Sequence, residues 1–185
     1  MFNPNDFRKD FPMFRNNTLM QGQPLVFLDN ASTTFKPDCV VQAVTDYYTK
    51  YTSNSHRGDY DLCYHMDEMV LESRKEIASF INCKPEEVVF TSGTTGSLNL
   101  VAFGYGAKYL KEGDEILLTQ AEHASNVLPW FKVHEMTGAT VNYIPLDERG
   151  RLTVENLKKA ITPRTKIVAV AHVTNVLGYI APIKE

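Results

Sequence analysis

The sequence is poor in cysteine, and the few cysteines form no pattern that could cross-link the chain or bind a metal. Its three cysteines, Cys39, Cys63 and Cys83, are an odd number at wide spacings, without a C-x-x-C pair or histidines placed nearby as zinc ligands. A disulfide framework and a metal site are therefore not expected. Each thiol is expected to be a small buried side chain rather than a nucleophile.

An excess of charge of one sign and long apolar runs are also missing. Lysine and arginine number 19 against 22 aspartate and glutamate residues, so the net charge of -3 offers no basic field for nucleic acid or a membrane surface. The first residues have no cationic start before an apolar core, and no later run is long enough to span a membrane. We therefore expect a cytoplasmic protein that acts on a small molecule, with neither nucleic acid nor a membrane as partner.

The composition that remains is that of an ordinary globular protein. Of the 185 residues, 43% are hydrophobic and 22% are charged. A chain of this length can bury one substantial core, so we expect one domain or part of a larger one.

The first half of the chain predicts two long helices. Residues 24–29 are apolar and read as a short strand or an extended segment. Apolar residues then recur at helical spacing over 39–51 and again over 62–81, and the polar stretch 52–58 separates the two predicted helices.

The second half alternates between short β-branched runs and amphipathic runs. It predicts strands at 88–90, 115–119, 140–144 and 166–173, with helices at 95–110, 130–137 and 154–161. Strands that alternate with helices indicate an α/β fold with a mostly parallel sheet and helices on both faces.

The loop at 91–97, which follows the first of these predicted strands, has the composition of a phosphate-binding turn. Gly93 lets the backbone approach an anion, and Thr94 and Thr95 place hydroxyls beside the free amides of a helix N-terminus. A glycine turn with a threonine helix cap is an equally good interpretation of this segment alone.

Two further loops follow predicted strands and carry one polar group each. His123 lies after the strand at 115–119, where an imidazole could stack on a flat heteroaromatic ligand or transfer protons. Asn175 follows the strand at 166–173 and could donate to a ligand oxygen. A structural histidine and an ordinary turn asparagine are the alternatives. Because ligands bind beyond the carboxyl ends of parallel strands, we expect the three loops to form one site for a phosphorylated aromatic ligand.

The polar stretch between the two long helices contains a fourth candidate group. His56 and Arg57 lie in the segment Ser-His-Arg-Gly, and together they could bind the carboxylate of a substrate. A solvated loop is the alternative interpretation.

These segments together resemble the class V aminotransferases of fold type I, and among them the cysteine desulfurases that feed iron–sulfur cluster assembly. The likeness covers nearly the whole chain, and its motifs occur in the family's order: FLDNASTTFKP, SHRG, VVFTSGTTGSLNLVA, EHASNVLPW and HVTNVLGYIAPI. The resemblance implies that residues 24–185 are the N-terminal part of a large domain that binds pyridoxal 5′-phosphate, preceded by an arm at 1–23. Ala124 and Gly96 depart from the family, since a second histidine and an acidic residue are common there.

The resemblance also implies a role for each candidate residue. Thr94 and Thr95 match the positions that hold the cofactor's phosphate group. His123 matches the catalytic histidine that stacks on the pyridine ring. Asn175 matches an amide near the phenolic oxygen and the substrate, and His56 matches a substrate-pocket residue.

The implied activity is conversion of L-cysteine to L-alanine, with the sulfur retained as a protein persulfide. An amino acid resembling L-cysteine, a sulfur-acceptor protein and a second copy of the full-length protein would be the partners. Neither the family's cofactor-binding lysine nor its nucleophilic cysteine has a match in residues 1–185, so we expect no turnover from this chain alone. Another class V enzyme such as a selenocysteine lyase or an epimerase, a non-catalytic truncated fragment, and an unrelated phosphate-binding α/β protein remain the alternatives.

Overall fold

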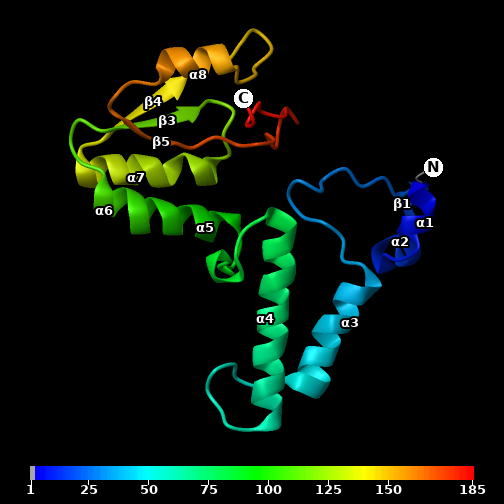
Figure 1. Ribbon diagram of the computed structural model, residues 1–185. Helices are drawn as coiled ribbons and strands as arrows, with labels where there is room; N and C mark the ends of the chain where they lie inside the picture. The colour runs from blue at the N-terminus through cyan, green and yellow to red at the C-terminus, as the bar shows by residue number, and fades with distance from the viewer. Residues whose placement is uncertain (1–2) are drawn as a thin grey trace. The chain divides into compact units, whose positions relative to one another are not determined.

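The structure, a computed structural model, describes residues 3–185. It divides into two compact units, Met1–Val89 and Phe90–Glu185 (Figure 1). Within the described residues no helix is both long enough and apolar enough to cross a membrane. The predicted division into an arm at 1–23 and a domain at 24–185 stays a prediction, and residues 1–2 of that arm lie outside the described residues.

The first unit is mostly helical. In chain order its elements are α1 (Pro4–Arg8), α2 (Pro12–Asn16), β1 (Leu19–Met20), β2 (Gln23–Pro24), α3 (Asp38–Asp46), a π-helical turn (Tyr47–Tyr51), α4 (Asp61–Ile81) and a 3₁₀ turn (Pro85–Glu87). Strands β1 and β2 pair antiparallel. The segment predicted at 24–29 is extended and only its first residue lies in a strand.

Both long helices of the first half are confirmed. Helix α3 begins at Asp38 and continues through the π-helical turn to Tyr51. Helix α4 ends where Asn82 adopts a left-handed conformation with φ of 58°, which stops the helix without a glycine.

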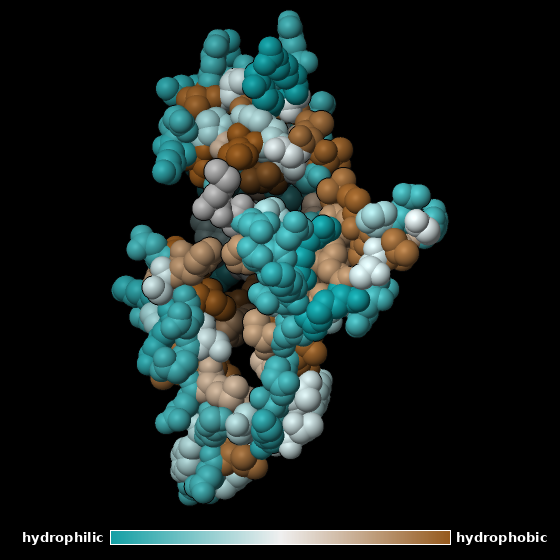
Figure 2. Space-filling view, turned by 90° about the vertical axis from the view of Figure 1, so that its right-hand side faces the viewer, coloured by the Kyte–Doolittle hydropathy of each residue, from teal (hydrophilic) through white to brown (hydrophobic). Residues whose placement is uncertain are grey.

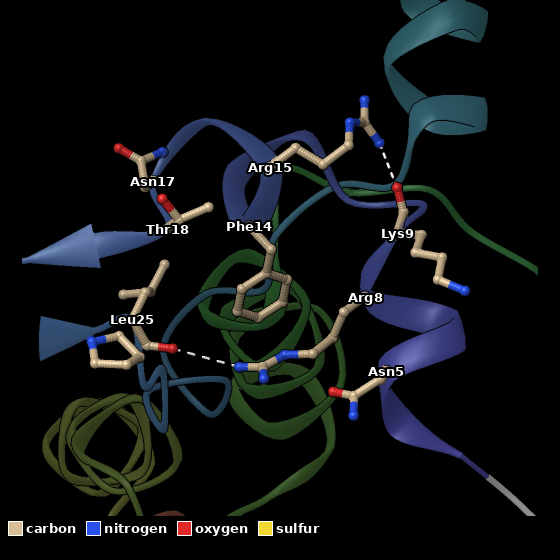
Figure 3. A pocket seen from close by; sticks show the side chains of 9 residues that line it. Asn5, Arg8, Lys9, Phe14, Arg15, Asn17, Thr18 and Leu25 are labelled. Atoms are coloured by element: carbon tan, nitrogen blue, oxygen red, sulfur yellow. Dashed lines mark hydrogen bonds between the residues drawn. The ribbon is translucent and has the colours of Figure 1, made fainter.

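An ion pair joins α2 to α3, and a cation–π contact joins α1 to α2. The guanidinium of Arg15 binds the Asp38 carboxylate through two hydrogen bonds of 2.7 and 2.8 Å. Figure 3 shows Arg15 and Arg8 on the wall of a hollow, with Arg8 donating to the carbonyl of Leu25. The Arg8 guanidinium also lies 4.5 Å above the ring of Phe14.

The second unit is a three-stranded parallel sheet with the order β4-β3-β5. Its elements are α5 (Thr94–Val101), a π-helical turn (Ala102–Gly106), α6 (Ala107–Tyr109), β3 (Glu115–Thr119), a 3₁₀ turn (Ala124–Asn126), α7 (Leu128–Thr137), β4 (Thr140–Ile144), α8 (Val154–Ala160) and β5 (Thr165–Val168). The predicted α/β class is confirmed, and helix α7 begins two residues earlier than expected, with Pro129 in its first turn.

Helices cover both faces of this sheet, as predicted. On one face Ile116 and Leu118 pack with Trp130 of α7 and with residues of the α5–α6 segment. On the other face Leu117 packs with Leu152 and with residues of α8 (Figure 1). Every residue of β3 is buried, and each fully buried Leu or Ile contributes about 1.5–3 kcal/mol. The hydrophobic core of the unit is therefore built around β3.

The prediction of a strand at 88–90 is wrong. Val88 is extended, but residues 88–90 are assigned to no strand. The carbonyl of Val88 instead accepts a hydrogen bond from the guanidinium of Arg74 in α4. A β-branched run adopts strand pairing only when a ladder partner is available, and here a side chain takes the place of that partner.

The last strand is shorter than predicted, since β5 ends at Val168 rather than at residue 173. The Ala169 amide still donates to the Leu117 carbonyl at 2.9 Å, but the Ala171 amide donates to the side chain of Glu122 at 3.0 Å. Because a carboxylate replaces the backbone acceptor, the ladder stops while the chain stays extended.

The first unit leaves many large apolar side chains exposed, and brown apolar patches are visible among the hydrophilic side chains in Figure 2. Within its described residues the buried apolar side chains are Cys63, Ala78 and Val88. Fewer apolar atoms are thus removed from water here than in the second unit, and local stability should be correspondingly low.

Candidate functional site

The candidate site lies in the second unit, beyond the carboxyl ends of the parallel strands. Two loops leave these ends directly: the loop after β3 carries His123 and the loop after β5 carries Asn175. The turn at 91–97 leads into α5 and carries Thr94 and Thr95. This is the edge of an α/β sheet at which small ligands bind.

Hydroxyl groups brace the turn before α5. Gly93 has φ of 145° and ψ of 174°, which only glycine adopts without strain. The Thr91 and Ser97 hydroxyls lie 2.7 Å apart, and the Ser97 amide donates to the Gly93 carbonyl at 3.0 Å. Among the described residues the hydroxyls of Thr94 and Thr95 have no hydrogen-bond partner, so both are available to a ligand at the helix N-terminus.

His123 caps the 3₁₀ turn that precedes α7. Its Nδ1 atom accepts a hydrogen bond from the Ser125 amide at 3.1 Å and also contacts the Ser125 hydroxyl. Since Nδ1 is an acceptor, the neutral ring carries its proton on Nε2. His123 is exposed.

Thr95 and His123 line the same hollow, which has a volume of about 460 Å³. Its walls come from α5, the π-helical turn that follows α5, and the start of α7; the other lining residues are Asn99, Phe103, Ala124, Ser125, Leu128, Pro129 and Lys132. The phosphate-type turn and the imidazole, which are far apart in the sequence, are therefore brought together. Lys132 also lines the hollow, but its ammonium group is paired with the Glu135 carboxylate at 2.6 Å.

Asn175 lies at the same end of the sheet but does not line that hollow. It sits in a turn closed by the Gly178 amide, which donates to the Thr174 carbonyl at 3.0 Å, and Gly178 has a positive φ of 64°. The Asn175 side chain is exposed and has no hydrogen-bond partner among the described residues. Its amide is therefore available to a ligand or to another segment.

His56 belongs to the first unit, where two residues of α4 hold its loop. Its backbone amide donates to Asp67 Oδ1 at 2.8 Å, and its ring Nδ1 lies 3.2 Å from the same oxygen. The buried thiol of Cys63 donates to the Asn54 carbonyl at 2.9 Å and accepts from the Gly58 amide at 3.2 Å. These contacts explain how His56 is held at a left-handed φ of 56°.

One residue of the site, Glu122, was missed in the sequence reasoning. It directly precedes His123, and its carboxylate accepts hydrogen bonds from Thr119, Asn126 and Ala171. The sequence signal that could have identified Glu122 is an acidic residue three positions after a strongly apolar strand. Among the described residues no group of three or more His, Cys, Asp or Glu side chains could hold a metal ion.

The chain belongs to the class V aminotransferase family, whose pattern it matches over residues 26–185. It is 45% identical over 184 residues to a probable cysteine desulfurase of Halalkalibacterium halodurans, covering 99% of this chain and 45% of that protein. The apo cysteine desulfurase of Thermococcus onnurineus NA1 is 40% identical, with a TM-score of 0.88 over 100% of this chain and 44% of that one.

A more distant neighbour shares the fold alone. This is a C-DES variant with glycine covalently linked to its PLP cofactor, 21% identical, with a TM-score of 0.78 over 95% of this chain and 43% of that one. The chain thus spans less than half the length of these three proteins.

Proposed function

We propose that this chain supplies the phosphate and ring contacts of a pyridoxal 5′-phosphate pocket in a cysteine desulfurase. The observation that carries the proposal is the shared hollow of Thr95 and His123 in a chain of the class V aminotransferase family. The substrate would be L-cysteine or a close analogue, and the products would be L-alanine and sulfur held as a persulfide. Assembly as a homodimer and transfer of the sulfur to an acceptor protein for iron–sulfur clusters are further parts of this proposal.

The residues present fit this cofactor. The hollow of about 460 Å³ has the size of a small-molecule site. The Thr94 and Thr95 hydroxyls and the free amides of α5 suit a phosphate group, and Gly93 lets the backbone approach it. The apolar side chains of Phe103 and Leu128 suit the faces of a pyridine ring.

Each residue would have a distinct task. When bound, the cofactor supplies an electron sink for charge that develops on the substrate's α-carbon. Thr94 and Thr95 would bind and orient the phosphate, while the His123 ring would stack on the heteroaromatic ring and hold a proton at Nε2. Asn175 would donate to a ring oxygen or a substrate oxygen, and His56 would bind the substrate carboxylate.

The chain's own cysteines would not serve as the sulfur-accepting nucleophile. Cys63 is buried and fully hydrogen-bonded, but the expectation of a buried thiol is wrong for Cys39, which is exposed, and holds only in part for Cys83. None of the three matches the nucleophilic cysteine that the resemblance implies. We therefore propose that residues 1–185 bind the cofactor's phosphate without turning over cysteine.

Calorimetric titration of the chain with pyridoxal 5′-phosphate and with pyridoxal tests the phosphate contacts. A charge-assisted hydrogen bond is worth about 1.5–3 kcal/mol, so the phosphorylated form should bind at least about tenfold more tightly. The T94A/T95A variant should reduce this difference, and the backbone amides of α5, which the variant keeps, should retain the rest. Thr140→Ala, at the amino end of β4 and so at the other end of the strand from the site, removes a hydroxyl that donates to the Asp114 carbonyl at 3.4 Å and should leave the preference for the phosphorylated form unchanged. Equal binding of both compounds to the unmodified chain would contradict the proposal.

A further inference from the structure

The Glu122 carboxylate joins three segments at the carboxyl end of the sheet. Its Oε1 atom accepts from the Thr119 hydroxyl at 2.8 Å and from the Ala171 amide at 3.0 Å. Its Oε2 atom accepts from the Asn126 side-chain amide at 2.8 Å. The end of β3, the turn after His123 and the chain beyond β5 therefore share one acceptor group.

The network continues into the core. The Oδ1 atom of Asn126 accepts from the indole nitrogen of Trp130 at 3.4 Å. Asn126 is 8% exposed and Trp130 is 3% exposed, so both are held by packing as well as by hydrogen bonds. Every donor in the network is neutral: Thr119, Asn126 and Ala171 donate to the carboxylate, and Trp130 donates to Asn126. A glutamine at position 122 would accept through one side-chain atom and donate through the other. It could not replace the Glu122 carboxylate, which accepts from all of its partners.

This network spans the segments that carry two candidate ligand-binding residues. His123 is bonded to Glu122 through the backbone, and Ala171 lies four residues before Asn175. Glu122 and Thr174 also line one small cavity beside the sheet. A shift of the Glu122 side chain would therefore move both loops relative to β3.

We propose that Glu122 is a positioning residue that holds the His123 loop and the Asn175 loop at a set spacing. The effect of Glu122 on ligand binding rests on the proposed function, but its role in holding the two loops does not. The carboxylate accepts from the Ala171 amide, which makes no ladder hydrogen bond to β3. The Glu122 carboxylate therefore holds both the carboxyl end of β3 and the loops that carry His123 and Asn175.

A swap of the amide and the carboxylate tests this role. In Glu122→Gln one acceptor oxygen becomes a donor that faces the Asn126 amide, and in Asn126→Asp two carboxylates face each other. In the E122Q/N126D variant the new amide donates to the new carboxylate, whose other oxygen still accepts from Trp130. Glu148→Gln, at an exposed position without a side-chain hydrogen bond among the described residues, is the matched control.

The first readout is the ¹⁵N spectrum of the histidine side chains, recorded without ligand. We expect His123 in the Nε2–H form in the unmodified chain, a tautomer mixture and faster Ala171 amide exchange in each single variant, and recovery of both signals in the double variant. Unchanged signals in E122Q, or a double variant that does not recover the His123 signal, would overturn the proposal. A merely structural role would lower thermal stability without this reciprocal rescue.

The second readout is the affinity for pyridoxal 5′-phosphate. We expect about a tenfold loss in E122Q, as for one lost charge-assisted hydrogen bond, and recovery in the double variant. If the unmodified chain does not bind the compound but the histidine signals respond as expected, the proposed function fails and the positioning role stands. Loss of affinity in E122Q without recovery in a double variant whose His123 signal has recovered would contradict the link between positioning and binding.

Discussion

At the scale of single residues, buried polar groups in this chain are satisfied by partners far away in the sequence. Glu115 at the start of β3 has a side chain that is 4% exposed, and it binds Thr162 at 2.7 Å and Arg164 at 2.8 Å. The hydrogen bond from Thr162, followed by those from Arg164 and Thr165, holds the pKa of Glu115 below the ordinary value of a glutamate. This group couples the stability of the second unit to pH.

The depressed pKa of Glu115 predicts a loss of stability in acid. The stabilising contribution is fully present above the pKa of an unfolded glutamate, about 4.3, and is lost as the pH falls through the lower folded value. Glu115→Gln should therefore lower the thermal midpoint at pH 7 and flatten its dependence on pH below about 4.5. Thermal unfolding followed by circular dichroism from pH 3 to 7 measures this, with E148Q as control; parallel curves for E115Q and the unmodified chain would contradict it.

The buried thiol of Cys63 is expected to stabilise the loop that carries His56. Cys63→Val removes a donor to the Asn54 carbonyl and an acceptor for the Gly58 amide. Asn54 is exposed and Gly58 is partly buried, so water can replace part of these contacts; a net hydrogen bond is worth about 0.5–1.5 kcal/mol, and the free energy of unfolding of the first unit should fall by about that amount. Urea unfolding measures the change. Cys39→Ala, at an exposed position, should stay within about 0.5 kcal/mol of the unmodified chain.

At the scale of secondary-structure elements, the turn before α5 depends on one backbone conformation. Gly93 has φ of 145°, and nothing lies within 4 Å of a Cβ atom built there, so the cost of a side chain at this position is conformational rather than steric. Gly104, in the π-helical turn, also has open space around a Cβ atom but an ordinary φ. Alanine substitutions at Gly93 and Gly104 therefore distinguish the cost of backbone strain from the cost of packing.

Gly93→Ala should destabilise the turn by about 1–3 kcal/mol, because a residue other than glycine is strained at that φ. It should also weaken binding of pyridoxal 5′-phosphate, since the Thr94 and Thr95 hydroxyls follow the turn. Gly104→Ala should be neutral or stabilising by about 0.5–1 kcal/mol. Chemical denaturation together with the calorimetric titration checks both variants, and equal behaviour of the two would be evidence against a strained turn.

At the scale of the whole molecule, the two units differ in how much apolar surface they bury. The second unit packs apolar side chains on both faces of β3. The first unit exposes much of its apolar surface on its helical segments, where examples are Val44 of α3, Tyr48 of the π-helical turn that follows it, and Leu71 and Phe80 of α4. Patches of this kind mark surfaces that other protein segments cover.

This difference predicts unequal protection from hydrogen exchange. Amides of β3 should exchange slowest, because their exposure requires loss of the whole core of the second unit. Amides of α1 and α2, two five-residue helices without buried residues, should exchange fastest. Exchange followed by mass spectrometry at peptide resolution measures this order. Equal protection of α4 and β3 would show that the chain unfolds as one cooperative unit.

Local patterns were enough to predict most helices, the strands at 115–119 and 140–144, the α/β class and the family. Helical periodicity and β-branched runs are properties of neighbouring residues, so they can be read without knowing the partners. The glycine-threonine turn and His123 were found for the same reason, since each follows a recognisable strand or turn signal.

Only the tertiary structure decided where strands end and which loops meet. The run at 88–90 forms no strand, and its Val88 carbonyl accepts from Arg74; β5 stops at Val168, and the Ala171 amide beyond it donates to Glu122. Each of these hydrogen bonds joins residues that are distant in the sequence, 49 positions apart for Glu122 and Ala171. A residue's own neighbourhood contains no trace of such a bond, because its free energy depends on the position of a second chain segment.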